Sequence, residues 1–181
     1  VMKMPNVFQN EVADASDEEK KAIMEAVEGA IEKLEAFRKQ EGEALAVKLS
    51  GNISNIAALL QSVEPYENER VEKIRARITD SLEKLAGVDY DKNRLEQELI
   101  YYIEKLDVNE EKQRLTNHLK YFAETMDGDK GQGKKLGFIA QEMGREINTL
   151  GSKSNHAEMQ NIVVKMKDEL EQIKEQVLNI M

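Results

Sequence analysis

Apolar residues recur at intervals of three and four along most of this chain, and this spacing constrains the fold more than any other feature of the sequence. Such intervals place apolar side chains on one face of an α-helix. The clearest series is the last one, which consists of Met159, Ile162, Met166, Leu170, Ile173, Val177 and Ile180. Its spacing is typical of a coiled coil or a helical hairpin. With only two prolines and ten glycines in 181 residues, the sequence predicts an all-α protein.

Helix start and stop signals divide this pattern into two regions. Ser16 and Glu19 have the spacing of a capping box, so a long helix should follow them and continue until Pro65 stops it. A second helix, joined to the first through Pro65, is expected to lie antiparallel to it. We therefore predict a long helical hairpin over residues 1–88. A C-terminal helical domain of the bundle or coiled-coil type is predicted over residues 89–181.

Composition excludes several classes of protein. Cysteine is absent, which rules out disulfides and thiolate chemistry and leaves oxygen and imidazole as the metal ligands. No apolar run approaches the roughly 18 to 20 residues that span a bilayer, so we expect a soluble protein with no membrane partner. The net charge of −9 argues against a general nucleic-acid coat.

The segment from residue 128 to residue 153 differs from the rest because its cations outnumber its anions. A local surface that binds anions is therefore compatible with the acidic total. The alternative is an ordinary solvated helix surface, which is what charge runs usually are.

The same segment carries the first group of candidate functional residues. Glu142 and Glu146 lie four residues apart, on the same side of the predicted helix, with Arg145 beside them. Two like charges at this spacing destabilise a helix by a few tenths of a kcal/mol. Arg145, another segment of the chain or a metal ion could offset that cost.

A second group of candidates precedes it. If one helix includes them all, Asp107, Glu111, Arg114 and His118 fall on one face, because they are spaced by four, three and four residues. Hard divalent cations such as magnesium or manganese choose carboxylate oxygens, and a histidine shifts the choice toward manganese or zinc. The alternative is a helix N-terminus where acidic residues favour the helix dipole and His118 packs within the bundle.

Several polar blocks resemble the C-terminal region of the YicC family in their order and spacing. They are residues 105–111 (KLDVNEE) with Arg114 and His118, residues 133–136 (GKKL), residues 141–153 (QEMGREINTLGSK) and residues 171–179 (EQIKEQVLN). Residues 4–5 and 41–42 resemble the middle region of the same family. The similarity therefore covers the whole chain.

This resemblance implies a bacterial, cytoplasmic, metal-dependent endoribonuclease that acts on single-stranded RNA and assembles as a ring-like homo-oligomer, a hexamer. Family members carry a further N-terminal domain of about a hundred residues. On this comparison the chain is expected to be a fragment without that domain.

The leading hypothesis is hydrolysis of an RNA phosphodiester with the help of one or two divalent cations, manganese or magnesium. The candidate metal ligands are Asp107, Glu111, Glu142 and Glu146. The candidate catalytic residues are His118, Glu142 and Glu146, with His118 as a ligand or as a general acid or base. The candidate RNA-binding residues are Lys134, Lys135, Arg145 and Lys153.

Two other functions are compatible with the same residues. The polar block could fix the register of a helical assembly domain that has no enzymatic activity. The chain could also be an adaptor that binds RNA without cleaving it, in which case binding would depend on salt.

Overall fold

The computed structural model describes residues 14–84, 91–128 and 131–180, and α-helix is the only regular structure in them. The predicted all-α class is therefore confirmed. The chain forms two compact units, Val1–Glu43 and Ala44–Met181, which are described separately. This division differs from the predicted boundary after residue 88, since buried residues on both sides of that boundary belong to one core.

The first helix, α1 (Asp17–Gln61), begins at the capping box that the sequence predicts. The Ser16 amide donates to Glu19 Oε2 at 2.8 Å, and the Glu19 amide donates to Ser16 Oγ at 3.2 Å. The hydrogen bond from the Ser16 amide, and after it one from the Ser16 side chain, lower the pKa of the Glu19 carboxyl group. The exchange satisfies two of the backbone donors that a helix N-terminus leaves free.

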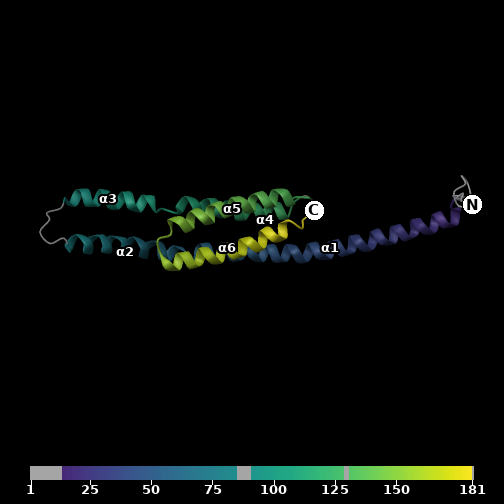
Figure 1. The fold of residues 1–181 in the computed structure, drawn as a ribbon, viewed down its shortest axis with the longest axis horizontal. Helices are drawn as coiled ribbons and strands as arrows, with labels where there is room; N and C mark the ends of the chain where they lie inside the picture. The colour runs from purple at the N-terminus through teal and green to yellow at the C-terminus, as the bar shows by residue number, and fades with distance from the viewer. Residues whose placement is uncertain (1–13, 85–90, 129–130, 181) are drawn as a thin grey trace, which may run out of the picture. The chain divides into compact units, whose positions relative to one another are not determined.

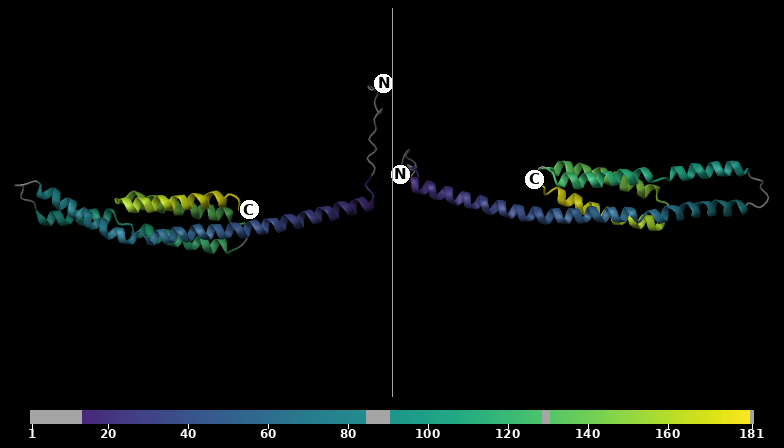
Figure 2. Two further views of the ribbon diagram at one scale, coloured as in Figure 1. Left: turned by 90° about the horizontal axis from the view of Figure 1, so that it is seen from below. Right: turned by 180° about the vertical axis from the view of Figure 1, so that it is seen from behind.

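The second helix, α2 (Glu64–Glu83), does not turn back on α1. In Figures 1 and 2 it leads on from the C-terminal end of α1, and α3 (Lys92–Lys105) lies alongside it. The link keeps helical hydrogen bonds, from the Ser62 amide to Ala58 O and from the Val63 amide to Leu60 O. Pro65 fits the first turn of α2, where its missing N–H costs nothing. The expected antiparallel pairing of the first two helices is therefore wrong.

The core of the second unit is formed by the C-terminal part of α1 together with α4 (Asn109–Met126), α5 (Gly133–Lys153) and α6 (Ala157–Val177). These elements lie together in both views of Figure 2. Apolar residues at helical spacing supply the core, since Leu136, Ile139, Met143, Ile147 and Leu150 of α5 are all buried. Burial of such a stripe is what stabilises amphipathic helices in a protein.

The helices α4 and α5 pack against each other as an antiparallel pair. Contacts along it join Glu111 to Lys153, Arg114 to Glu146 and Tyr121 to Lys135. Residue numbers rise on α4 as they fall on α5, which fixes both the direction and the register. No helix in the described part of the chain is long and apolar enough to cross a membrane.

Candidate functional site

Charged residues and one tyrosine lie along one side of the contact between α4 and α5. We call this surface the α4–α5 seam and define it by Glu110, Arg114, His118 and Tyr121 on α4 and by Lys135, Glu142, Arg145 and Glu146 on α5. Its centre is Arg114, which forms an ion pair with Glu110 and lies 3.9 Å from Glu146 Oε1. One guanidinium therefore connects the two helices.

The two predicted catalytic carboxylates have separate cationic neighbours. Arg145 lies 2.9 Å from Glu142 Oε1, and Arg114 approaches the buried carboxylate of Glu146. Of the three ways to offset their repulsion, the structure therefore uses the neighbouring arginine and another segment of the chain. Because the Glu146 side chain is only 11% exposed, its interaction with Arg114 is screened less by water than an interaction at the surface.

His118 lies half-buried on the same side of α4 as Arg114, one helical turn further along. Because α4 and α5 are antiparallel, the turn of α4 that contains His118 is directed toward the turn of α5 that contains Glu142. Glu142 lies one turn before Glu146. Within the described residues, no hydrogen bond or ion pair involves the His118 imidazole. The imidazole therefore has ring nitrogens available for a proton transfer.

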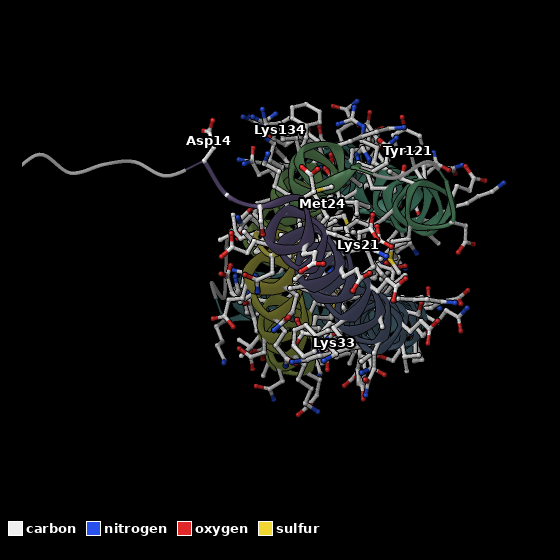
Figure 3. The ribbon with its side chains drawn as sticks, turned by 90° about the vertical axis from the view of Figure 1, so that its right-hand side faces the viewer. Asp14, Lys21, Met24, Lys33, Tyr121 and Lys134 are labelled. Atoms are coloured by element: carbon white, nitrogen blue, oxygen red, sulfur yellow. The ribbon has the colours of Figure 1, made fainter. Side chains whose placement is uncertain are left out.

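Aromatic and basic residues extend the seam toward the start of α5. The ammonium group of Lys135 lies 4.7 Å from the centre of the Tyr121 ring. Figure 3 labels Tyr121 and Lys134 on the outer side of α4 and of α5, and Tyr121 is 45% exposed. An exposed aromatic ring beside cations can stack on a base of single-stranded nucleic acid. Tyr121 was not among the predicted site residues, although its place one turn from His118 is readable in the sequence.

The remaining predicted residues meet at the other end of the α4–α5 pair. Lys153 Nζ donates to Glu111 Oε1 at 2.8 Å and to the carbonyl oxygen of Asp107 at 2.9 Å. Asp107 lies outside α4, and its Oδ1 accepts a hydrogen bond from the Asn109 amide at the start of that helix. The single helical face predicted for Asp107, Glu111, Arg114 and His118 is therefore interrupted at its first member.

Arg70 of α2 lies at this same end of the α4–α5 pair, which we call the junction. It was not among the site residues predicted from the sequence. Its guanidinium donates to Leu106 O at 2.8 Å and to Lys153 O at 3.1 Å, so it binds carbonyl groups at the C-terminal ends of α3 and α5. Burial lowers the pKa of Arg70, and the nearby carboxylates of Glu67 and Asp107 oppose this shift. A cation at helix C-termini interacts favourably with the helix dipoles. The partners lie 36 and 83 residues away, so no local sequence signal marks them.

The predicted metal ligands do not form one cluster. Lys153 pairs with Glu111 and Arg145 pairs with Glu142. Arg114 approaches Glu146, and Asp107 Oδ1 accepts a hydrogen bond from the Asn109 amide. In the described ranges no three histidine, aspartate or glutamate side chains are grouped so that they could hold a metal ion. The side chains of a single copy therefore do not fit the predicted ion, and the metal requirement stays a prediction.

These features define an all-α protein with a polar seam, and sequence comparison assigns its class. Residues 63–181 match the family described as "Endoribonuclease YicC-like, C-terminal", and residues 1–47 match "Endoribonuclease YicC-like, N-terminal region". The chain belongs to this family. The expectation that the chain lacks the N-terminal region is wrong, because the second match covers its first 47 residues.

Two curated relatives are similar over almost the whole chain. "Probable endoribonuclease YicC" of Clostridioides difficile (strain 630) is 34% identical over 185 residues, which is 99% of this chain and 62% of the relative. "Probable endoribonuclease YicC" of Haemophilus influenzae (strain ATCC 51907 / DSM 11121 / KW20 / Rd) is 31% identical over 180 residues, with the same two coverages. The chain thus spans 62% of the length of these relatives.

Proposed function

We propose that this chain carries an endoribonuclease site and that RNA binds along the α4–α5 seam. Membership of the family and the names of the two relatives support cleavage of RNA. The observation that supports this location is the position of Arg114, which lies between carboxylates of both helices. One turn further along α4 is the His118 imidazole, which has no hydrogen bond or ion pair within the residues that the structure describes.

In the proposed reaction, water adds to the phosphorus of a phosphodiester and a P–O bond to the leaving sugar oxygen breaks. His118 moves a proton to or from the reacting oxygen, a role that imidazole fills near neutral pH. Arg114 stabilises the negative charge that develops on the phosphate oxygens. Glu110 and Glu146 hold the Arg114 guanidinium in place.

Single-stranded RNA is the proposed substrate form because the seam offers a stacking residue and exposed cations. Tyr121 stacks on an unpaired base, while Lys134, Lys135 and Arg145 bind phosphates. All four side chains are exposed in this chain. Lys153 lies away from these exposed cations. Its ammonium group donates hydrogen bonds to Glu111 and to the carbonyl oxygen of Asp107.

His118 is the proposed general acid or base of the reaction. We expect His118→Ala to slow the cleavage of a single-stranded RNA by about 100-fold or more, the usual contribution of a general acid or base. Gel analysis of a labelled oligonucleotide measures the rate. Gln113→Ala is the matched control, because Gln113 is exposed on α4 and lies outside the seam. Equal rates for the parent and for His118→Ala, with both variants folded by circular dichroism, would remove His118 from the reaction.

The same assay distinguishes an endoribonuclease from the two alternatives, an RNA-binding adaptor and an assembly domain. An RNA-binding adaptor would leave the RNA intact and would bind it more weakly after Lys134→Ala. An assembly domain would bind no RNA, and Glu142→Ala would change its oligomeric state. Parallel reactions with manganese, magnesium or a chelator test whether cleavage requires a metal ion. The metal requirement and the cytoplasmic location both stay predictions.

A further inference from the structure

The outer face of α5 carries a row of exposed residues that follow one another at intervals of four and three. This spacing places their side chains on one side of the helix. The row, which we call the α5 stripe, consists of Lys134, Phe138, Gln141, Arg145, Asn148 and Ser152. Lys134, labelled in Figure 3, marks its N-terminal end. Arg145 also belongs to the α4–α5 seam, so the two surfaces are continuous.

Phe138 is the one apolar member of the α5 stripe, and it is 62% exposed. Its neighbours in the sequence, such as Leu136 and Ile139, are buried in the core. A phenyl ring that stays in contact with water contributes little to the hydrophobic stabilisation of the fold. The packing of α5 therefore does not account for an aromatic ring at position 138.

The charges around this ring are positive, although the net charge of the chain is −9. Lys134 lies one helical turn before Phe138, and Arg145 lies two turns after it. The α5 stripe contains no carboxylate. Glu142 lies toward α4, and its side chain is only 20% exposed and pairs with Arg145 at 2.9 Å. Cations on both sides of an exposed aromatic ring attract the phosphates of a single strand whose bases can stack on the ring.

The polar members of the α5 stripe narrow the choice of partner further. A second copy of the chain fits poorly, because a helix–helix interface requires apolar residues to recur at this spacing, and Phe138 is the one such residue here. The amide groups of Gln141 and Asn148 both donate and accept hydrogen bonds. They match the edges of unpaired bases, which proteins read in single-stranded RNA.

We propose that the α5 stripe binds single-stranded RNA and that Phe138 stacks on one of its bases. The stripe is about 27 Å long, given a rise of about 1.5 Å per residue, which is enough for several nucleotides. Phe138 is thereby a second stacking residue beside Tyr121. The link of this surface to RNA cleavage rests on the proposed function, whereas stacking itself requires no cleavage.

The test uses the fact that the chain contains no tryptophan. Phe138→Trp in the full chain places one fluorophore at this position, and a base that stacks on the indole quenches its emission. We expect a short oligouridine to quench the emission, read directly after mixing while gel analysis shows the RNA to be intact. Polyphosphate, which has no bases, and an RNA duplex, whose bases are paired, should leave it unchanged. Val47→Trp is the matched control, because Val47 is 75% exposed on α1, outside the stripe.

Substitutions that remove the ring provide the second arm. Phe138→Ala and Phe138→Leu are each expected to weaken oligouridine binding by about tenfold, because neither side chain can stack, whereas Phe138→Tyr should bind as the parent does. Circular dichroism checks the fold of each variant, and Val47→Ala is the control. Full binding by Phe138→Leu would show that position 138 supplies apolar bulk only, and it would overturn the proposal.

Absence of quenching by oligouridine, or equal quenching by polyphosphate, would also overturn the proposal. An emission of Phe138→Trp that changes with protein concentration and not with RNA would do the same, because a second copy would then cover the ring. Quenching without RNA cleavage would refute the proposed function alone. Cleavage without quenching would refute the stacking site alone.

Discussion

At the scale of single residues, Lys153 is a predicted RNA-binding residue whose ammonium group already has partners within the chain. The sequence predicted a phosphate contact, since Lys153 closes a polar block with several cations. The structure places its ammonium between Glu111 and the Asp107 carbonyl, and the Glu111 side chain is only 6% exposed. A buried carboxylate that loses its cation is strongly disfavoured. We therefore expect Lys153 to contribute to the stability of the junction, and its contact with RNA stays a prediction.

This assignment predicts a loss of stability. Lys153→Ala should lower the free energy of unfolding by about 2–3 kcal/mol, because Glu111 would remain buried without a partner. Urea denaturation followed by circular dichroism measures the change. Lys134→Ala is the control, since Lys134 is exposed, and it should alter stability by no more than about 0.5 kcal/mol. If the two variants were equally stable and Lys153→Ala bound RNA more weakly, the original prediction of an RNA contact would be right.

The residue types at the site were predictable, but their partners were not. Helical spacing correctly placed Glu142 and Glu146 on one side of α5, because it depends only on local geometry. The link from Arg114 to Glu146 and that from Arg70 to the ends of α3 and α5 join residues far apart in the sequence. Such contacts depend on how the helices pack. No periodicity within one helix determines them.

At the scale of helices, the contact between α5 and α6 depends on a residue without a side chain. A Cβ atom on Gly151 would lie 2.9 Å from Val163 Cγ1, closer than packed atoms approach each other. Val163 is buried and β-branched, so it has little freedom to move aside. Gly151 therefore permits the close approach of the two helices at the end of α5.

A pair of alanine substitutions tests this contact. Gly151→Ala should destabilise the protein by about 1–3 kcal/mol through overpacking. Gly137→Ala, in the same helix, should instead be stabilising by up to about 1 kcal/mol, because its Cβ would lie 3.6 Å from Val177 Cγ1 and alanine favours the helix. Thermal unfolding of both variants gives the comparison. Equal shifts of Tm in the same direction would show that the α5–α6 contact does not require glycine at position 151.

The helices themselves were largely predictable, whereas the turns between them were less so. The Ser16 capping box and the apolar series of α5 and α6 confirm that local hydrogen bonding and burial mark helix positions well. The break between α3 and α4 could be read from the sequence only as a kink or a separation. Leu106 ends α3 where Arg70 binds its carbonyl oxygen, and that arginine belongs to another helix. Pro65 was misread because proline is as compatible with the first turn of a new helix as with a reversal.

At the scale of the whole molecule, the first unit leaves an apolar surface uncovered. Ile23, Val27, Ile31 and Leu34 of α1 recur at helical spacing, yet each is between 46% and 59% exposed. Met24, labelled in Figure 3, belongs to the same stretch and is 57% exposed. In water such a stripe favours association with another apolar surface.

A second copy of this chain is the partner that the spacing favours, because apolar residues at intervals of three and four can pack against the same pattern in a coiled coil. The homo-oligomer that the family resemblance implies, a hexamer, would cover the stripe in this way. We expect Ile31→Glu with Leu34→Glu to reduce the molar mass in solution to that of the single chain, since each new charge would have to be buried in the interface. Sedimentation equilibrium measures the mass, and Glu32→Gln with Glu35→Gln is the matched control, because these exposed acidic residues directly follow Ile31 and Leu34. A parent protein that sediments at 20.6 kDa across all concentrations would contradict the prediction. Helicity retained in the charged variant would show that it lost its partner rather than its fold.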